Sequence, residues 1–237
     1  MAHIPRIYIP GRIEPGALTL SGETARRLTG VMRLRPGEEF RVFSGDGHEW
    51  RATLRTTAKD RAQAEVGEVT RQEPLSERVL EMWVALVRPN RFDWAIEKCV
   101  EAGADIIRPL VSEFAARGEG ASAQRQQRWE RIVIEASEQS GRLHLVAVER
   151  PARFADLVSR GLGALVVADL SGQPPKAVLG LLPPRGRVAV AIGPEGGFSE
   201  AELATARLHG ALLVSLGPHI LRTETAAVIA TAIFRAG

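Results

Sequence analysis

Two stretches of the chain combine glycine, proline and polar residues in a pattern that can build a small-molecule site. They are Gly193-Pro-Glu-Gly-Gly-Phe-Ser199 and Leu216-Gly-Pro-His-Ile-Leu221. In each stretch the proline removes a backbone N–H and the glycine allows backbone angles that other residues avoid, so each predicts a sharp loop. Bare backbone in such loops can hydrogen-bond the polar edges of a ligand while apolar side chains flank its rings.

The neighbouring elements predict where these loops lie. Arg187–Ile192 is a β-branched, apolar run typical of a buried parallel strand, and Ser199 is a good N-cap for a helix whose first turn carries Glu200 and Glu202. Open α/β sheets bind ligands at the carboxyl ends of such strands. We therefore expect the two loops to face each other across one pocket. The alternative is a pair of tight turns with no ligand.

Other common chemistries fit poorly. The first loop lacks both the Gly-Lys-Ser/Thr end of a P-loop and the G-x-G-x-x-G spacing of a dinucleotide site. The five histidines and one cysteine show no metal-ligand spacing, so we expect no metal. That cysteine, Cys99, lies on an apolar helix face and is expected to be a small buried filler and not a nucleophile.

The composition is that of a globular protein with a mild excess of positive charge. The chain has 237 residues, 45% of them hydrophobic, and a formal charge of +3. No apolar run approaches the roughly 18 residues of a membrane span, and the first residues do not form a secretory signal, so a cytoplasmic location is expected. Almost all positive charge is arginine, which binds phosphate bidentately. A coding bias toward arginine would give the same count.

Hydrophobic periodicity divides the chain into two domains. Residues 1–73 read as short strands with one helix near residues 22–30, and predict a small β-barrel or sandwich. A proline-containing polar break follows, and from residue 79 strands alternate with helices. Residues 74–237 therefore predict an α/β domain with a mainly parallel sheet. The expected strands of this domain cover 79–87, 105–111, 143–148, 164–170, 187–192 and 211–216, and the clearest helices cover 92–102 and 124–140.

Several further motifs leave two interpretations open. Arg26, Arg27, Arg33 and Arg35 form either a phosphate-facing patch or a solvated edge. Small residues at Ala226, Ala227 and Ala230 suit tight packing inside the fold or against a second copy of the chain. Along the helix ending near residue 140, Glu135, Glu138 and Arg142 have the spacing of an ordinary exposed charge ladder.

The two loop motifs together resemble the RsmE family of SPOUT-class methyltransferases, which act on N3 of a uridine in 16S ribosomal RNA. The two most specific motifs run from Ile192 to Glu202 and from Leu216 to Ala226. The resemblance as a whole covers essentially the entire chain. Supporting pieces are Val31–Gly37, Arg91 with Lys98, Glu101–Gly103 and Glu135–Arg142.

This resemblance implies a trefoil-knotted α/β domain preceded by a PUA-like β-barrel that binds RNA. It also implies a homodimer that uses S-adenosylmethionine and acts on 16S ribosomal RNA or the small ribosomal subunit. Matched position by position, the residues expected to bind the cofactor are Ile192, Gly193, Glu195, Gly196, Gly197, Leu216, Gly217, Ile220, Leu221, Thr225 and Ala226.

The chemistry requires uridine N3 to lose a proton and attack the methyl group in line. Arg222 is the first candidate to stabilise the developing anion, and its alternative role is a salt bridge to Glu224 or Glu135. An arginine cannot serve as a general base at neutral pH. Glu138 is a weaker candidate for the base, or a group that orients the uracil edge through Gln139. The candidate RNA contacts are Arg26, Arg33, Arg91, Gln139 and Arg142.

Two departures from the family pattern bear on the substrate contacts. An arginine expected soon after Glu113 is replaced by Phe114-Ala-Ala, with Arg117 as its substitute, and His219 stands where a basic residue is common. Two other functions stay open: an RNA-binding accessory protein of the same fold without turnover, and a methyltransferase for a different RNA position.

Overall fold

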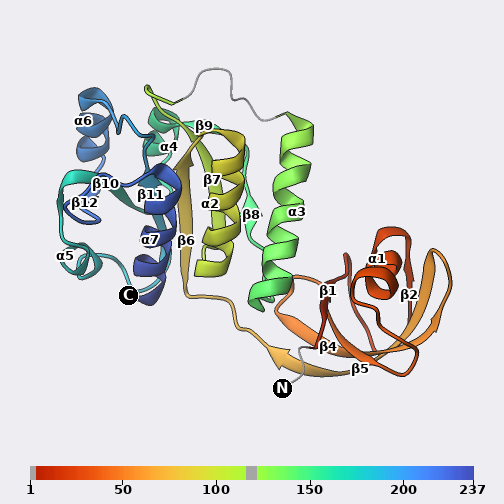
Figure 1. Cartoon of the computed structure of the whole chain (residues 1–237). Helices are drawn as coiled ribbons and strands as arrows, with labels where there is room; N and C mark the ends of the chain where they lie inside the picture. Colours follow the sequence, from red (N-terminus) through yellow and green to blue (C-terminus); the bar gives the residue numbers. More distant parts are fainter. Residues whose placement is uncertain (1–3, 116–121) are drawn as a thin grey trace. The chain divides into compact units, whose positions relative to one another are not determined.

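The computed structural model describes residues 4–115 and 122–237, which form two compact units (Figure 1). One unit comprises Met1–Leu75 with Ser137–Leu145, and the other comprises Ser76–Ala136 with Val146–Gly237. The boundary at residues 73 and 74 drawn from the sequence treats each domain as continuous, whereas here a short later segment joins the N-terminal unit.

The N-terminal unit is built on a five-stranded sheet in the order β1-β3-β4-β5-β2. β1 runs parallel to β3, and the other neighbours are antiparallel. Alternating side chains of β3 and β4 point inward, so Phe40 and Leu54 are completely buried in its core. The strands are β1 (Arg6–Tyr8), β2 (Gly16–Ser21), β3 (Glu39–Phe43), β4 (His48–Thr57) and β5 (Arg61–Gln72).

The helix expected near residues 22–30 is present but irregular. It begins as the short α-helix α1 (Gly22–Arg26) and continues as a π-helical turn, η1 (Arg27–Val31). The wider turn ends with the N–H of Met32 bonded to the Arg27 carbonyl at 2.9 Å. Single π-helical turns are uncommon and often lie at functional positions.

The C-terminal unit contains a parallel sheet with strand order β12-β10-β11-β6-β7-β8, and β9 also pairs with β7. Its central strands, β6 and β11, are nearly continuous runs of buried residues, as expected for a sheet covered on both faces. The mainly parallel α/β architecture is confirmed. The strands are β6 (Arg78–Ala85), β7 (Ile106–Val111), β8 (Ala147–Val148), β9 (Ala152–Arg153), β10 (Ala164–Gln173), β11 (Gly186–Ile192) and β12 (Leu212–Val214).

Helices cover this sheet. α2 and α7 pack side by side, and α7 also packs on β6 and β11 (Figure 1). Elsewhere α4 packs on α6, beside a core that contains Trp83, Phe154 and Phe198. The helices are α2 (Pro89–Ala102), α3 (Ala123–Ser140), α4 (Phe154–Ser159), α5 (Pro175–Leu179), α6 (Glu200–Leu208) and α7 (Thr223–Ala236).

The strand expected over residues 143–148 is wrong in its first half. Only Ala147–Val148 pair with β7. The preceding residues bond to the N-terminal unit instead: Leu143 donates its N–H to Glu73 at 2.8 Å, and His144 pairs with Asp46 in an isolated bridge. These competing hydrogen bonds remove residues 143–145 from the parallel sheet. The strand expected at 211–216 is also shorter, at Leu212–Val214.

β10 contains an interruption that the sequence did not predict. Ala168 and Gln173 both pair with Val214 of β12, so the residues between them loop out of the ladder. Gly172 allows the chain to pass there, because a Cβ at that position would lie 2.4 Å from the backbone carbon of Val214. The looped-out residues include Asp169 and Leu170.

Candidate active site

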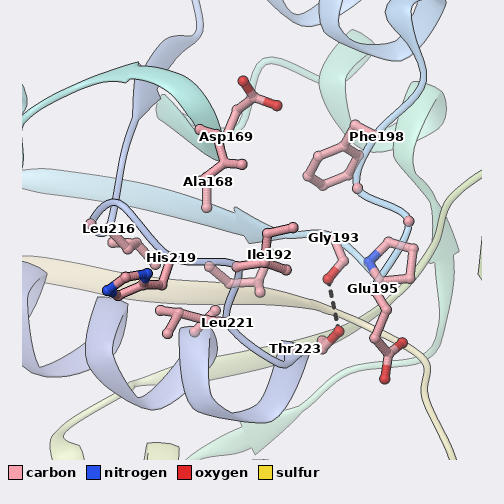
Figure 2. A pocket seen from close by; sticks show the side chains of 17 residues that line it. Ala168, Asp169, Ile192, Gly193, Glu195, Phe198, Leu216, His219, Leu221 and Thr223 are labelled. Atoms are coloured by element: carbon pink, nitrogen blue, oxygen red, sulfur yellow. Dashed lines mark hydrogen bonds between the residues drawn. The ribbon is translucent and has the colours of Figure 1, made fainter.

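A cavity of about 310 Å³ opens at the carboxyl ends of β10 and β11 in the C-terminal unit (Figure 2). Its walls come from the first loop, Gly193–Phe198, the second loop, Leu216–Leu221, and the looped-out end of β10. Thr223 and Ala226 of α7 complete the lining. The two glycine-proline loops therefore face one pocket, as their positions after parallel strands indicated.

Close packing determines the shape of the first loop. The N–H of Gly197 donates to the Pro194 carbonyl at 2.8 Å, and Gly197 has a φ of 73°, where side chains are strained. A Cβ at Gly193 would approach the Phe198 ring to 3.1 Å. Thr223 of α7 donates its hydroxyl to the Gly193 carbonyl at 3.0 Å (Figure 2), so the loop is tied to the last helix.

Helix α6 begins directly after this loop with a complete capping box. The Ser199 hydroxyl accepts from the N–H of Glu202 at 3.3 Å, and the Glu202 carboxylate accepts from the N–H of Ser199 at 2.9 Å. The other Glu202 oxygen accepts from the N–H of Glu113 at 2.9 Å. The N-cap expected from the sequence is therefore confirmed, and it anchors the carboxyl end of the first loop.

The second loop presents apolar side chains and an imidazole to the cavity. Gly217 has a φ of 135°, and its carbonyl accepts from the Ser215 hydroxyl at 3.2 Å. Leu216, His219 and Leu221 line the cavity and lie together on one side of it in Figure 2. Ile220 also lines the cavity and is 78% exposed, which is unusual for an isoleucine.

The third wall was missed by sequence reasoning. Ala168, Asp169 and Leu170 line the cavity because β10 leaves its ladder there. The Asp169 carboxylate is oriented by Ser171, whose N–H and hydroxyl donate to it at 2.8 and 2.5 Å. The only local signal was the Ser171-Gly172 pair at the end of an apolar run, which does not reveal a loop that returns to the same strand.

The cavity has an acidic and apolar character. Its charged side chains are Asp169 and Glu195, and no lysine or arginine is among the described residues that line it. His219 is the only basic group in that lining. A cavity lined by carboxylates and apolar side chains suits a ligand that carries a cationic group together with a flat, weakly polar ring.

Most residues expected to bind the cofactor are brought together. Ile192, Gly193, Glu195, Gly196, Gly197, Leu216, Gly217, Ile220, Leu221 and Ala226 all line the cavity. Thr225 does not, although its neighbour Ala226 does. The cavity thus brings together two motifs whose nearest lining residues, Phe198 and Leu216, are separated by the whole of α6 and β12.

Arg222 occupies the N-cap position of α7, between two lining residues. Its backbone is extended, with a φ of −65° and a ψ of 151°, and its carbonyl accepts from the N–H of Ala226 at 2.9 Å. Its side chain is exposed and makes no hydrogen bond or ion pair with the residues that the structure describes. The alternative salt bridge to Glu224 is not formed, since the nearest cation to Glu224 is Arg91, at 3.7 Å.

Glu138 lies in the N-terminal unit, where its carboxylate is held on both oxygens. Arg27 donates to one oxygen at 2.6 Å, and the N–H of Tyr8 donates to the other at 2.9 Å. Arg6 caps the same helix end by donating to the carbonyls of Ser137 and Glu138, each at 3.1 Å. These contacts give Glu138 a structural function, and its assignment as a base stays a prediction.

The expected RNA contacts differ in their surroundings. Arg26 pairs with Asp60 at 3.0 Å on an exposed surface, whereas Arg33 is exposed with a φ of 56°, in the left-handed region. Gln139 is exposed at the end of α3, and the carbonyl of Arg142 accepts from Arg6 at 3.4 Å. Arg91 pairs with Glu195 of the first loop at 2.8 Å. Arg117 lies outside the described residues.

Comparison with known protein families places the chain among the RNA methyltransferases. The RNA methyltransferase domain family matches residues 74–235, and the RNA methyltransferase PUA domain family matches residues 20–67. Ribosomal RNA small subunit methyltransferase E from Synechocystis is 34% identical over 231 residues, covering 95% of this chain and 75% of that protein. The Bacillus subtilis protein of the same name is 30% identical, with 92% and 89% covered.

Two solved structures are similar over almost their whole length. A Legionella pneumophila methyltransferase with bound S-adenosylmethionine has a TM-score of 0.88 and 30% identity, with 99% of this chain and 98% of that chain covered. A ribosomal RNA small subunit methyltransferase E from Neisseria gonorrhoeae bound to S-adenosyl methionine has a TM-score of 0.86 and 31% identity, with the same coverage. The chain belongs to the ribosomal RNA small subunit methyltransferase E family, which confirms the resemblance inferred from its two loops.

The described parts of the chain lack two other features. Residues 4–115 and 122–237 contain no helix long and apolar enough to cross a membrane. The same residues contain no cluster of three or more histidine, cysteine, aspartate or glutamate side chains able to hold a metal ion.

Proposed function

We propose that this protein transfers a methyl group from S-adenosylmethionine to N3 of a uridine in 16S ribosomal RNA. The observation that carries the proposal is the single cavity built by both glycine-proline loops. It is supported by family membership and by similar proteins whose structures contain S-adenosylmethionine.

The cavity residues fit this cofactor. The loops Gly193–Gly197 and Leu216–Gly217 bring backbone N–H and C=O groups to the cavity, and those not bonded within the loops can hydrogen-bond the adenine edge. Ile192, Leu216 and Leu221 supply apolar surface for its ring. The Asp169 carboxylate gives the cavity a negative field, which favours a sulfonium cation, whereas the charge of Glu195 is paired with Arg91. Bound there, S-adenosylmethionine supplies an electrophilic methyl group.

The protein's own residues position the base and stabilise its charge. When N3 loses its proton, negative charge spreads over the uracil ring, and a nearby fixed cation lowers the energy of that state. Arg222 is suited to this function because its exposed side chain has no partner among the described residues. In the chain it lies between Leu221 and Thr223, which line the cavity. Glu138 stays the candidate acceptor for the proton.

The N-terminal unit is proposed to bind the RNA. Arg33 is the strongest candidate contact, because an exposed arginine in the left-handed region keeps a costly conformation that glycine would adopt without strain. Arg26, Gln139 and Arg142 of the same unit remain further candidates, and Arg91 of the C-terminal unit is another. A polyanionic partner also agrees with the net charge of +3.

The trefoil knot, the homodimer and the cytoplasmic location belong to the same proposal. The small face of α7 does not itself argue for a dimer, because Ala227 and Ala230 are fully buried within a single chain, where α7 packs on α2. A second copy would have to use another surface.

Titration calorimetry with S-adenosylmethionine tests the cofactor site. The intact protein should bind about one cofactor per chain. Gly196→Trp should abolish binding, because a Cβ at this lining position already lies 3.3 Å from Phe114, so an indole there must displace the first loop. Leu208→Trp is the matched control, since it adds the same ring at a side chain that is 86% exposed on α6. Equal binding by both variants would place the site elsewhere, and no binding by the intact protein would favour an RNA-binding protein without turnover.

A further inference from the structure

Arg91, in the first turn of α2, contacts two elements that build the cavity, the first loop and α7. Its Nη1 donates to Oε1 of Glu195 at 2.8 Å, and its Nε lies 3.7 Å from Oε1 of Glu224. Glu195 belongs to the first loop, and Glu224 belongs to the first turn of α7, directly after Thr223. One guanidinium therefore lies between the carboxylates of a cavity loop and a cavity helix.

The two carboxylates differ in what they require from Arg91. The Glu195 side chain is 52% exposed and can exchange its partner for water, whereas that of Glu224 is 10% exposed. The second oxygen of Glu224 is buried and has no hydrogen-bond partner among the described residues. A guanidinium can bond both oxygens of one carboxylate, and an unpaired buried oxygen is costly. Glu195 and Glu224 thus share one guanidinium, through its Nη1 and Nε atoms respectively.

The side chain of Glu195 is not needed to form the wall of the cavity. In Figure 2 its carboxylate is directed away from Ile192 and Leu221, while the neighbouring backbone lies at the cavity. The Arg91 pair is therefore a second tie that holds the first loop, beside the hydrogen bond from Thr223 to the Gly193 carbonyl at 3.0 Å.

We propose that Arg91 is a positioning residue of the cofactor cavity, which holds the first loop through Glu195 in the conformation that receives S-adenosylmethionine. This proposal rests on the proposed function, because it requires that the cavity binds this cofactor. It differs from the RNA contact expected of Arg91. Since the pair with Glu195 is partly exposed, its loss affects the order of the loop more than the stability of the fold.

The test compares S-adenosylmethionine affinity by calorimetry, without RNA, for the intact full chain, Arg91→Ala, Glu195→Gln and the double variant. Each single variant should bind about three- to fivefold more weakly, the loss expected for one partly exposed ion pair, and the double variant should be no weaker than either. Arg91→Lys should recover part of the affinity. Glu195→Gln leaves Arg91 beside buried Glu224, so it preserves the fold and should keep the same melting temperature.

Arg88→Ala is the matched control, because it removes an exposed arginine side chain at the N-cap of the same helix. The backbone carbonyl of residue 88, which accepts from the N–H of Phe92, is retained. It should bind like the intact protein. Wild-type affinity in both single variants, or losses that multiply in the double variant, would overturn the positioning role. Failure of the intact protein to bind S-adenosylmethionine would instead overturn the proposed function, so the two failures are distinct.

Discussion

Arg222 and Arg91 show how two arginines near one cavity have different surroundings. Arg91 is engaged by a loop carboxylate at 2.8 Å, whereas the Arg222 side chain has no partner in the described part of the chain. A cation that no neighbouring carboxylate neutralises is available to a substrate anion. The exposure of Arg222 therefore supports a role in the reaction and not in the fold.

Arg222→Ala is predicted to lower the rate of methyl transfer by about a hundredfold or more, the scale for removal of one group that stabilises a transition-state charge. Cofactor affinity should change less than threefold, because the cavity lining does not include this side chain. Methyl transfer to small-subunit RNA and calorimetry measure the two effects. Equal losses of transfer rate and cofactor affinity would make Arg222 structural. Arg222→Lys tests whether a positive charge without the guanidinium geometry supports methyl transfer.

Cys99 is a residue that function does not use. Burial raises the pKa of its thiol from 9.0 to about 12, although the Thr231 hydroxyl lies 3.3 Å from its sulfur. A thiol that stays protonated at neutral pH is a poor nucleophile. The expectation of a buried filler is confirmed by its complete burial between α2 and α7.

This pKa shift predicts how stability depends on pH. Between pH 9 and about 12 the unfolded chain releases the thiol proton while the folded protein retains it, so the stabilisation by Cys99 is complete below pH 9 and declines above it. Relative to Cys99→Ala, the intact protein should lose about 1.4 kcal/mol of unfolding free energy between pH 8 and pH 10. Urea denaturation of both proteins measures it, and a difference that is constant with pH would contradict the shift.

At the scale of elements, the start of α6 connects stability with the cavity. Its capping box provides hydrogen-bond acceptors for two backbone N–H groups at the start of the helix, directly after the first loop. Ser199→Ala is predicted to lower the free energy of unfolding by about 1 kcal/mol, and Ser199→Asp to retain most of it, because aspartate also caps well. Urea denaturation compares the variants, and equal stability of the two would exclude the cap as the cause.

Local elements could be predicted from the sequence because their causes are local. The cap at Ser199 and both glycine-proline turns depend on residues within a few positions of one another. The looped-out end of β10 depends instead on pairing with Val214 of β12, a residue far along the chain. Residues close to β10 in the sequence therefore could not predict it. The same reason explains why Asp169 was missed as a lining residue.

At the scale of the whole molecule, the N-terminal unit is not a continuous piece of chain. Glu138 receives hydrogen bonds from Arg27 and Tyr8, and Leu143 is fully buried in the segment that joins this unit. Periodicity located the change from strands to alternating helices, but it could not show that residues 137–145 return to the first unit. That return depends on partly buried hydrogen bonds between residues far apart in the chain, such as Leu143 and Glu73.

This arrangement predicts that a fragment of residues 1–75 is much less stable than the same sheet in the full chain. Without the later segment, Arg6, Arg27 and Glu73 lose partners at 2.6 to 3.1 Å, and the buried side chain of Leu143 is missing. Circular dichroism during urea denaturation of the fragment tests it. A cooperative transition at the midpoint of the full protein's first unit would show that residues 137–145 are dispensable.

The most direct test of the whole proposal is methylation of 16S ribosomal RNA by the purified protein with S-adenosylmethionine, followed by reverse transcription across the product. A methyl group on N3 blocks the base-pairing edge of uridine, so the proposal predicts a strong stop at one uridine, absent with Gly196→Trp. Free RNA and assembled small subunits should both be offered. Methyl transfer without such a stop would contradict N3 of uridine as the target, and no transfer to either substrate would contradict the enzyme itself.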